Sequence, residues 1–221
     1  TLWIRVVNTL LKIDAISLSF ASKEAEVSVL KRYSLTLQAG ETVCILGPSG
    51  CGKSSLLRAI AGFETIDAGT IHLNDTLLSS ATHIVAPEHR RVGFMFQDYA
   101  LFPHLNVADN IGFGLKKMAP QARAQQVQAM LALVDLEPYA KRFPHELSGG
   151  QQQRAALARA LAPKPDILLL DEPFSNLDAD TRERLIVELR TILKQTGVTT
   201  LMVTHSHSEA VALGDRIERM G

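Results

Sequence analysis

The segment from Gly47 to Ser55, GPSGCGKSS, constrains this chain more than any other because its pattern requires one particular backbone arrangement. It satisfies G-x-x-x-x-G-K-[ST], follows the apolar run Val43 to Leu46 and precedes the helical sequence Lys53 to Ala61. In that strand-to-helix context the glycines let backbone N–H groups turn inward on phosphate oxygens, and the helix N-terminus adds positive potential. The sequence therefore predicts a phosphate-binding turn.

We expect this turn to bind a nucleoside triphosphate together with Mg²⁺. Lys53 supplies a mobile positive charge, and the hydroxyl of Ser54 is a ligand for the metal. A glycine-rich turn that happens to precede a lysine is the alternative, which the nine-residue match in its context disfavours. The predicted nucleotide-binding residues are Gly47, Pro48, Ser49, Gly50, Cys51, Gly52, Lys53, Ser54 and Ser55.

The composition excludes several classes of protein. The 221 residues are 46% hydrophobic, which is enough for one sizeable domain or two closely joined lobes. Lys plus Arg and Asp plus Glu number 23 each, so no global field attracts nucleic acid or anionic lipid, and no nucleic-acid partner is predicted. Cys44 and Cys51 lie where neither a disulfide framework nor a zinc site fits, which favours a reducing, cytosolic compartment.

No segment reads as a membrane span or a secretory signal. No uninterrupted apolar run approaches the roughly 18 residues needed to cross a bilayer. The N-terminal TLWIRVVNTLL lacks the small-residue cleavage site of a signal peptide. If a membrane matters, we expect another chain to cross it, and we expect the first eight or nine residues to lie outside the fold.

Alternating apolar and polar residues predict strands in the first part of the chain. Leu11 to Phe20 and Tyr33 to Leu37 have the pattern of half-buried strands around a Lys-Glu-rich loop. Gly69 to Leu73 and Arg91 to Phe96 indicate a second strand pair, separated by the turn-rich residues Asn74 to Glu88.

From about Asp98 to Ala162 the pattern becomes helical, and we interpret this part as a helical lobe inserted into a sheet domain. It includes a predicted helix over Gln121 to Val134. The apolar runs Ile167 to Leu170 and Thr199 to Val203 then predict two central parallel strands. Between them we expect a helix that is capped by Asp178, runs to Gln195 and ends at Gly197. The predicted fold class is α/β, with a parallel sheet covered by helices.

Two acidic residues follow the first of these central strands. Asp171 and Glu172 stand at its carboxyl end, where open α/β sheets bind their ligands. Asp171 is suited to hold Mg²⁺ or its water shell, and Glu172 is suited to polarise the water that attacks the γ-phosphate. An ordinary solvated strand end is the alternative, and the phosphate-binding turn upstream makes it less favoured.

The string LSGGQQQR at residues 147–154 predicts a second anion-binding helix terminus. Its Ser-Gly-Gly sequence directly precedes a predicted helix over Gln151 to Leu161, whose N-terminus carries positive potential. A serine that merely caps the helix, with the two glycines as its turn, explains the composition about equally well.

These motifs together resemble one family. GPSGCGKSS, LSGGQQQR, ILLLDEP, SNLD at 175–178 and His205 occur in the order and approximate spacing of ATP-binding cassette ATPases, and the match spans residues 11–220. Residues 87–111 resemble bacterial importer ATPases. Residues 143–178 most resemble the ferric-iron importer subunit, although polyamine, sulfate and sugar importer ATPases share much of that string.

The resemblance implies a fold and a division of the chain. The fold is a phosphate-loop NTPase (RecA-like) core with an antiparallel β subdomain and an inserted α-helical subdomain. The whole cassette spans residues 10–221: the core and β subdomain occupy 10–97 and 163–221, and the helical subdomain occupies 98–162. A C-terminal regulatory domain, which this importer subgroup carries, is expected to be absent.

The resemblance also assigns roles. Phe20 matches the aromatic residue that stacks on adenine, Gln97 the glutamine that contacts Mg²⁺ and the attacking water, and His205 the histidine that contacts the γ-phosphate. An ordinary packed aromatic, a solvated glutamine and a satisfied strand-end histidine are their alternatives. Asp178 matches a loop aspartate that crosses the dimer interface, a role that can coexist with capping. The implied sets are Glu172, His205 and Gln97 as catalytic residues, Ser54, Gln97 and Asp171 as metal ligands, and Ser148, Gly149, Gly150 and Gln151 as the signature that acts in trans.

In the family two copies pair head to tail, and each ATP lies between the phosphate loop of one chain and the signature of the other. The implied partners are a second copy, transmembrane permease subunits and, indirectly, a periplasmic or extracellular solute-binding protein. The implied place is the cytoplasmic face of the bacterial inner membrane, as a peripheral subunit. Ser206 departs from the family pattern, which has an aspartate after the histidine, and we expect weaker local support for His205.

Two other classes of function compete with import. A cassette ATPase without a permease, acting on ribosomes or DNA, is disfavoured by the neutral charge and the single cassette. A small-molecule kinase is disfavoured by the signature string and by the absence of an evident acceptor site in the sequence.

Overall fold

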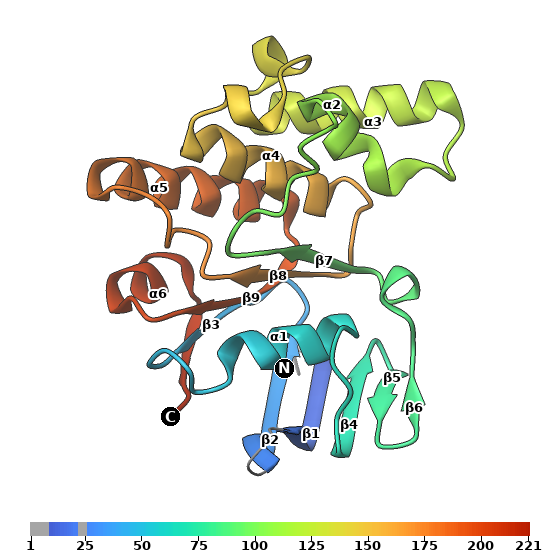
Figure 1. Cartoon of the computed structure of the whole chain (residues 1–221), viewed down its shortest axis with the longest axis vertical. Coiled ribbons are helices and arrows are strands. Elements are labelled where there is room, and N and C mark those ends of the chain that lie inside the picture. Colours follow the sequence, from blue (N-terminus) through green and yellow to red (C-terminus); the bar gives the residue numbers. More distant parts are fainter. Residues whose placement is uncertain (1–8, 22–25) are drawn as a thin grey trace, which may run out of the picture.

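The computed structural model describes residues 9–21 and 26–221, which form two sheets and a set of helices (Figure 1). Our expectation for the first eight residues and for most of the Lys-Glu-rich loop falls outside the described residues. Within them, no helix combines the length and the apolar character needed to cross a bilayer.

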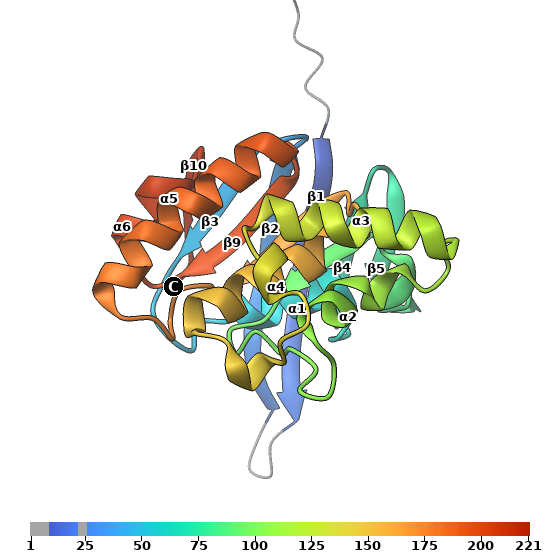
Figure 2. The same cartoon turned by 90° about the horizontal axis from the view of Figure 1, so that it is seen from above.

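One sheet is parallel and has five strands in the order β10, β3, β9, β8, β7. Every residue of β8 and β9 is buried, which confirms the two predicted central strands. In Figure 2, β3 and β9 lie side by side beneath α5. The bounds are Thr42–Leu46 for β3, Val92–Met95 for β7, Ile167–Asp171 for β8, Thr199–Thr204 for β9 and Arg216–Arg219 for β10.

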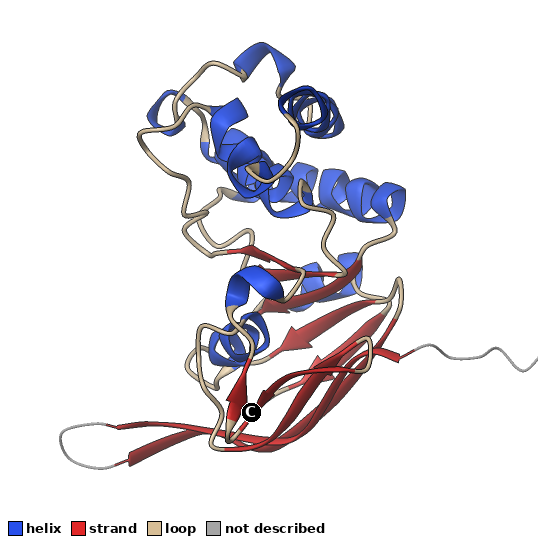
Figure 3. Ribbon diagram, turned by 90° about the vertical axis from the view of Figure 1, so that its right-hand side faces the viewer, coloured by secondary structure: helices blue, strands red, loops and turns tan. Residues whose placement is uncertain are grey.

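The second sheet is antiparallel, with the order β2, β1, β4, β5, β6 (Figures 1 and 3). The bounds are Thr9–Ala21 for β1, Glu26–Gln38 for β2, Ala68–Leu73 for β4, Thr76–Ser80 for β5 and His83–Ile84 for β6. The predicted pairing of the segment at 69–73 with the one at 91–96 is wrong, because β4 pairs with β1 and β5, whereas β7 pairs with β8. Asn74 and Asp75 both have positive φ and form a two-residue hairpin turn, so β5 begins within the segment predicted to be turns.

The helices follow the sequence pattern more closely. The bounds are Lys53–Ala61 for α1, Val107–Ile111 for α2, Pro120–Leu133 for α3, Gly149–Leu161 for α4, Ala179–Thr196 for α5 and His207–Leu213 for α6, with short 3₁₀ turns at Pro87–His89, Gly112–Leu115, Glu137–Tyr139 and Pro144–Glu146. The cap at Asp178 and the end at Gly197 are confirmed. Helix α4 begins two residues before its predicted start, since Ser148 caps it and both glycines join the first turn.

The parallel sheet separates two apolar cores. Leu168 and Leu170 of β8 pack among α4, α5 and the helices between residues 98 and 162, whereas Ile167 and Leu169 pack toward α1 and the antiparallel sheet. This alternation follows from the period of two along a strand. The helical residues therefore share a core with one face of the parallel sheet, which fixes their position relative to the strand ends.

Arg90 joins α1 to the antiparallel sheet. It is buried, and its guanidinium donates to the carbonyl oxygens of Ala59, Ile60, Leu78 and Val85 and to the hydroxyl of Ser79, at 2.7 to 3.1 Å. Burial lowers the pKa of Arg90 to about 10. Two of the acceptors belong to the last turn of α1, where the helix dipole favours a cation.

Replacement of Arg90 by Met is expected to lower the free energy of unfolding by about 3 kcal/mol, because buried carbonyl groups lose a charged donor. Urea denaturation measures this loss. Arg91→Met is the matched control: Arg91 is largely exposed and pairs with Asp166, so we expect a much smaller loss of stability. Equal losses in the two variants would contradict the role given to Arg90.

Candidate functional site

The phosphate-binding turn and the acidic strand end meet at one open cleft of about 440 Å³. Because the carboxyl ends of β3 and β8 lie at the same edge of the parallel sheet, residues that are far apart in the sequence meet there. Of the predicted residues, those that line the cleft are Ser49, Gly50, Gly52, Lys53, Ser54, Ser55, Gln97 and Glu172. Val29 also lines it, and sequence reasoning missed this residue because nothing distinguishes it from other strand valines.

The backbone of the turn requires glycine at several positions. Gly50 and Gly52 have φ of 81° and 99°, which side chains disfavour. At Gly47 the constraint is space, since a Cβ there would lie 2.2 Å from the carbonyl oxygen of Met220. The N–H of Met220 donates to Leu46 O at 3.0 Å, so the end of β10 closes on the start of the turn. The backbone is thereby held in a shape that leaves room for a phosphate chain.

Lys53 lies inside this turn and is almost completely buried. Its Nζ donates to the carbonyl oxygens of Gly47 and Pro48, both at 2.8 Å, and lies 3.7 Å from Glu172 Oε1. The ammonium group thus sits between the turn and the acidic strand end. A flexible stem with three donors lets it exchange these carbonyls for phosphate oxygens.

Ser54 and Asp171 form the pair best suited to a metal ion. The Ser54 hydroxyl donates to Asp171 Oδ1 at 2.7 Å, and burial raises the pKa of Asp171, partly opposed by that hydrogen bond. Among the described residues no group of three His, Cys, Asp or Glu side chains could hold a metal. Mg²⁺ typically takes one or two carboxylates and completes its shell with phosphates and water, so this hydroxyl and carboxylate fit it.

Glu172 is held by charge and by backbone geometry. Its Oε2 lies 3.1 Å from Nδ1 of His205, and its other oxygen faces Lys53. Its φ of 44° is unusual for a side chain of this size, and its N–H donates to Val203 O at 3.1 Å. Backbone strain of this kind gathers at functional sites, where the surroundings over-determine it.

Ser206, which stands where the family pattern has an aspartate, caps a helix and contacts Thr204. Ser206 caps α6 by accepting from the N–H of Glu209 at 3.4 Å, and its own N–H donates to the hydroxyl of Thr204. Thr204 in turn donates to Glu209 Oε2 at 2.5 Å. Serine and aspartate are comparably good N-caps. The turn that carries His205 is therefore anchored without an aspartate.

The four signature residues do not line this cleft. Ser148 caps α4 in a capping box: its hydroxyl accepts from the N–H of Gln151 at 3.3 Å, and its N–H donates to Gln151 Oε1 at 2.9 Å. Ser148 and Gly149 are exposed, while Gly150 packs against Leu185 of α5. The turn is an accessible helix N-terminus on another part of the chain.

Cys51, Asp178 and Phe20 are also absent from the cleft lining. Asp178 is exposed and caps α5, and the N–H of Thr181 lowers its pKa. Phe20 is 37% exposed and pairs with Val27 in the hairpin of β1 and β2. The roles of Asp178 and Phe20 stay predictions.

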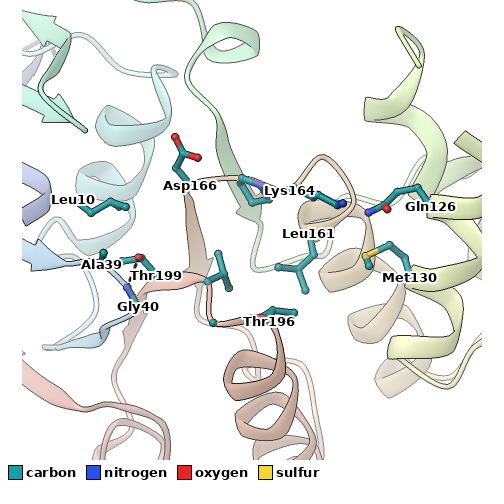
Figure 4. A pocket seen from close by; sticks show the side chains of 13 residues that line it. Leu10, Ala39, Gly40, Gln126, Met130, Leu161, Lys164, Asp166, Thr196 and Thr199 are labelled. Carbon is teal, nitrogen blue, oxygen red and sulfur yellow. Dashed lines mark hydrogen bonds between the residues drawn. The ribbon is translucent and has the colours of Figure 1, made fainter. Parts of the chain in front are cut away.

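A second hollow, of about 530 Å³, lies at the opposite edge of the parallel sheet (Figure 4). Met130, Leu161 and Val198 give it an apolar lining, and Thr199 marks the start of β9. It contains none of the predicted site residues. Its larger volume therefore carries less weight than the convergence of phosphate-binding, metal-binding and acidic groups at the first cleft.

The fold and the arrangement at the cleft are those of a phosphate-loop NTPase. The family model described as "ABC transporter" matches residues 30–175, and a model of an AAA domain matches residues 140–212. The chain therefore belongs to the ABC transporter family.

Known proteins of this family are similar over most of the chain. It is 47% identical to the spermidine/putrescine import ATP-binding protein PotA of Marinobacter nauticus, over 95% of this chain and 54% of the relative. It is 48% identical to the Fe(3+) ions import ATP-binding protein FbpC of Pseudomonas fluorescens, over 95% of this chain and 58% of the relative. It is 49% identical to the sulfate/thiosulfate import ATP-binding protein CysA 2 of Chromobacterium violaceum, over 86% of this chain and 51% of the relative. The chain spans about half the length of these relatives.

Among solved structures, the fold is similar to that of a dimeric ATP-binding cassette, MJ0796, in a post-hydrolysis state bound to ADP and Pi. The TM-score is 0.82 at 32% identity, and the match covers 96% of this chain and 94% of the other. A second dimeric structure of that cassette gives a TM-score of 0.83 at the same identity and coverage.

Ser54→Ala is expected to weaken nucleotide binding about tenfold in Mg²⁺, because the variant lacks the hydroxyl that we expect to bind the metal and that contacts Asp171. In EDTA the variant and the parent should bind a fluorescent ATP analogue equally. Titration under both conditions tests the assignment. An equal loss with and without metal would show that Ser54 acts through the shape of the turn instead.

Proposed function

We propose that this chain is the ATP-binding and ATP-hydrolysing subunit of a solute importer. The observation that carries the proposal is the meeting, at one cleft, of the buried Lys53, the Ser54 and Asp171 pair, and the strained Glu172. Relatives named as import ATP-binding proteins support it. The proposal includes a core and β subdomain at 10–97 and 163–221 and a helical subdomain at 98–162.

The residues divide the chemistry of phosphoryl transfer to water. The turn amides and Lys53 bind the β- and γ-phosphates, and Ser54, Asp171 and Gln97 would hold Mg²⁺, which when bound would neutralise charge on the phosphate oxygens. Glu172 accepts the proton of the attacking water, with His205 positioned beside it to contact the γ-phosphate.

The signature acts on the nucleotide of a second copy. Its exposed N-terminus is absent from the lining of the chain's own cleft, so a head-to-tail dimer lets Ser148, Gly149, Gly150 and Gln151 face the γ-phosphate of the partner. The dimeric structures of a similar cassette support the pairing of two copies. Asp178, at the start of α5, is proposed to lie in the same interface, and Phe20 to stack on the adenine.

Closure of the dimer is proposed to act on membrane-embedded permease subunits through the region around Gln97. The backbone oxygen of Gln97 accepts from Asn176 Nδ2 at 2.9 Å, which connects this residue to the loop after Glu172. A solute-binding protein outside the membrane would deliver the solute. The chain would then act as a peripheral subunit at the cytoplasmic face of the inner membrane.

Glu172→Gln is expected to keep ATP binding and to lower ATP hydrolysis at least about a hundredfold, because the proton acceptor is lost while the shape is kept. The trapped nucleotide should then hold two copies together. Size-exclusion light scattering with Mg²⁺ and ATP should give a dimer, and without nucleotide a monomer. Hydrolysis at the parental rate would remove Glu172 as the base.

The control places a second change on the signature. Ser148→Arg in the Glu172→Gln background should bind ATP as a monomer, because its target is the γ-phosphate in the other copy. Loss of ATP binding by this monomer would contradict an action in trans.

For the solute we propose ferric iron, on the strength of the string at 143–178 and the Fe(3+) relative. The names of relatives with nearly the same identity include spermidine/putrescine and sulfate/thiosulfate, so the three solutes must be compared directly. Cells that produce the protein with Glu172→Gln should lose uptake of radioactive ferric iron and retain uptake of spermidine and sulfate. Loss of a different uptake would assign that solute instead.

A further inference from the structure

Gln153 is a buried polar residue that none of the roles above uses. It lies on the second turn of α4, two residues after Gln151 of the signature, and is 4% exposed. Its Nε2 donates to Pro173 O at 3.1 Å, and among the described residues its Oε1 has no hydrogen-bond partner. A buried amide of this kind is costly unless its bonds are well formed, so the contact with Pro173 sets its orientation.

Pro173 directly follows Glu172, so this hydrogen bond connects the signature helix to the strand end that carries the proposed base. The signature turn approaches the residues after Glu172 at a second point as well. A Cβ at Gly149 would lie only 3.3 Å from Leu177 Cδ2. The loop from Pro173 to Leu177 is therefore packed against the signature turn at two points. Phe174, which is fully buried, fixes the loop to the core.

We propose that Gln153 is a positioning residue that couples the two nucleotide sites of the dimer. When the signature of one chain engages the ATP of its partner, a shift of α4 is carried through Gln153 to Pro173 and so to the Glu172 of the same chain. Each chain then adjusts its own base according to the nucleotide held by the other. This inference rests on the head-to-tail dimer of the proposed function.

The chain offers a matched control in Gln126. Its Nε2 donates to Ala162 O at 3.0 Å, so it has the same side chain, the same kind of acceptor and nearly the same length of bond. It joins α3 to the end of α4, however, and touches neither the signature nor the strand end. Substitution of either glutamine by Met removes one amide to carbonyl bond while keeping a side chain of similar length.

The experiment compares the parent, Gln153→Met and Gln126→Met by steady-state ATP hydrolysis. For Gln153→Met we expect kcat to fall about tenfold with KM unchanged, and the Hill coefficient for ATP to fall from near 2 toward 1. In the Glu172→Gln background this variant should still form the ATP-dependent dimer. Gln126→Met should keep the parental kcat and Hill coefficient.

Thermal midpoints separate coupling from general destabilisation. If Gln153→Met keeps the kcat and Hill coefficient of the parent, or if Gln126→Met lowers both as much, the proposal is overturned. If Gln153→Met does not fold, Gln153→Asn keeps the amide but is one methylene too short to reach Pro173, and it must give the same kinetic result. Failure of the proposed function would give a different result, because the parent protein itself would then neither hydrolyse ATP nor dimerise.

Discussion

The pairing register of three buried parallel strands is the constraint on which the rest of the site depends. Leu46 of β3 is level with Thr204 of β9, and Asp171 of β8 is level with Val203, so the phosphate-binding turn, the acidic pair and the histidine turn all leave the sheet at one edge. A slip of one residue would turn every side chain of a strand to the other core. The two apolar cores that clamp β8 and β9 therefore also hold the geometry of the cleft.

Although the chain has no net charge, charged groups gather at the cleft. The sequence carries 23 basic and 23 acidic residues, yet Lys53 is buried between backbone carbonyls and one carboxylate, and Asp171 is buried against a hydroxyl. Both groups are less well solvated than they would be at the surface, which makes phosphate and metal favourable partners. Arg90 shows the contrasting case, in which four carbonyl groups and the hydroxyl of Ser79 saturate a buried cation and leave it with a structural role.

From the sequence we predict the two central parallel strands, the long helices and most of the residues that line the cleft, because long periodic segments and a backbone-specific turn are local signals. The prediction is wrong for the segment at 74–88, because the two-residue turn at Asn74 and Asp75 joins β4 to β5 in a hairpin and does not open a loop. Arg90 and Val29 were missed for another reason: their environment is created by strands that are distant in sequence. Tertiary contacts of this kind produce no periodic pattern in the sequence.

The alternatives left open for the signature are not exclusive, and the weakness of its cap shows why. Asp178 accepts from Thr181 at 2.9 Å, whereas Ser148 accepts from Gln151 at 3.3 Å, which is long for an N–H···O hydrogen bond. A weak cap keeps the first turn of α4 formed in the single chain. Little hydrogen-bond energy is lost when the Ser148 hydroxyl and the backbone amides of this turn bind a phosphate instead. The same helix terminus can thus be stable in the monomer and still be available to the nucleotide of a partner.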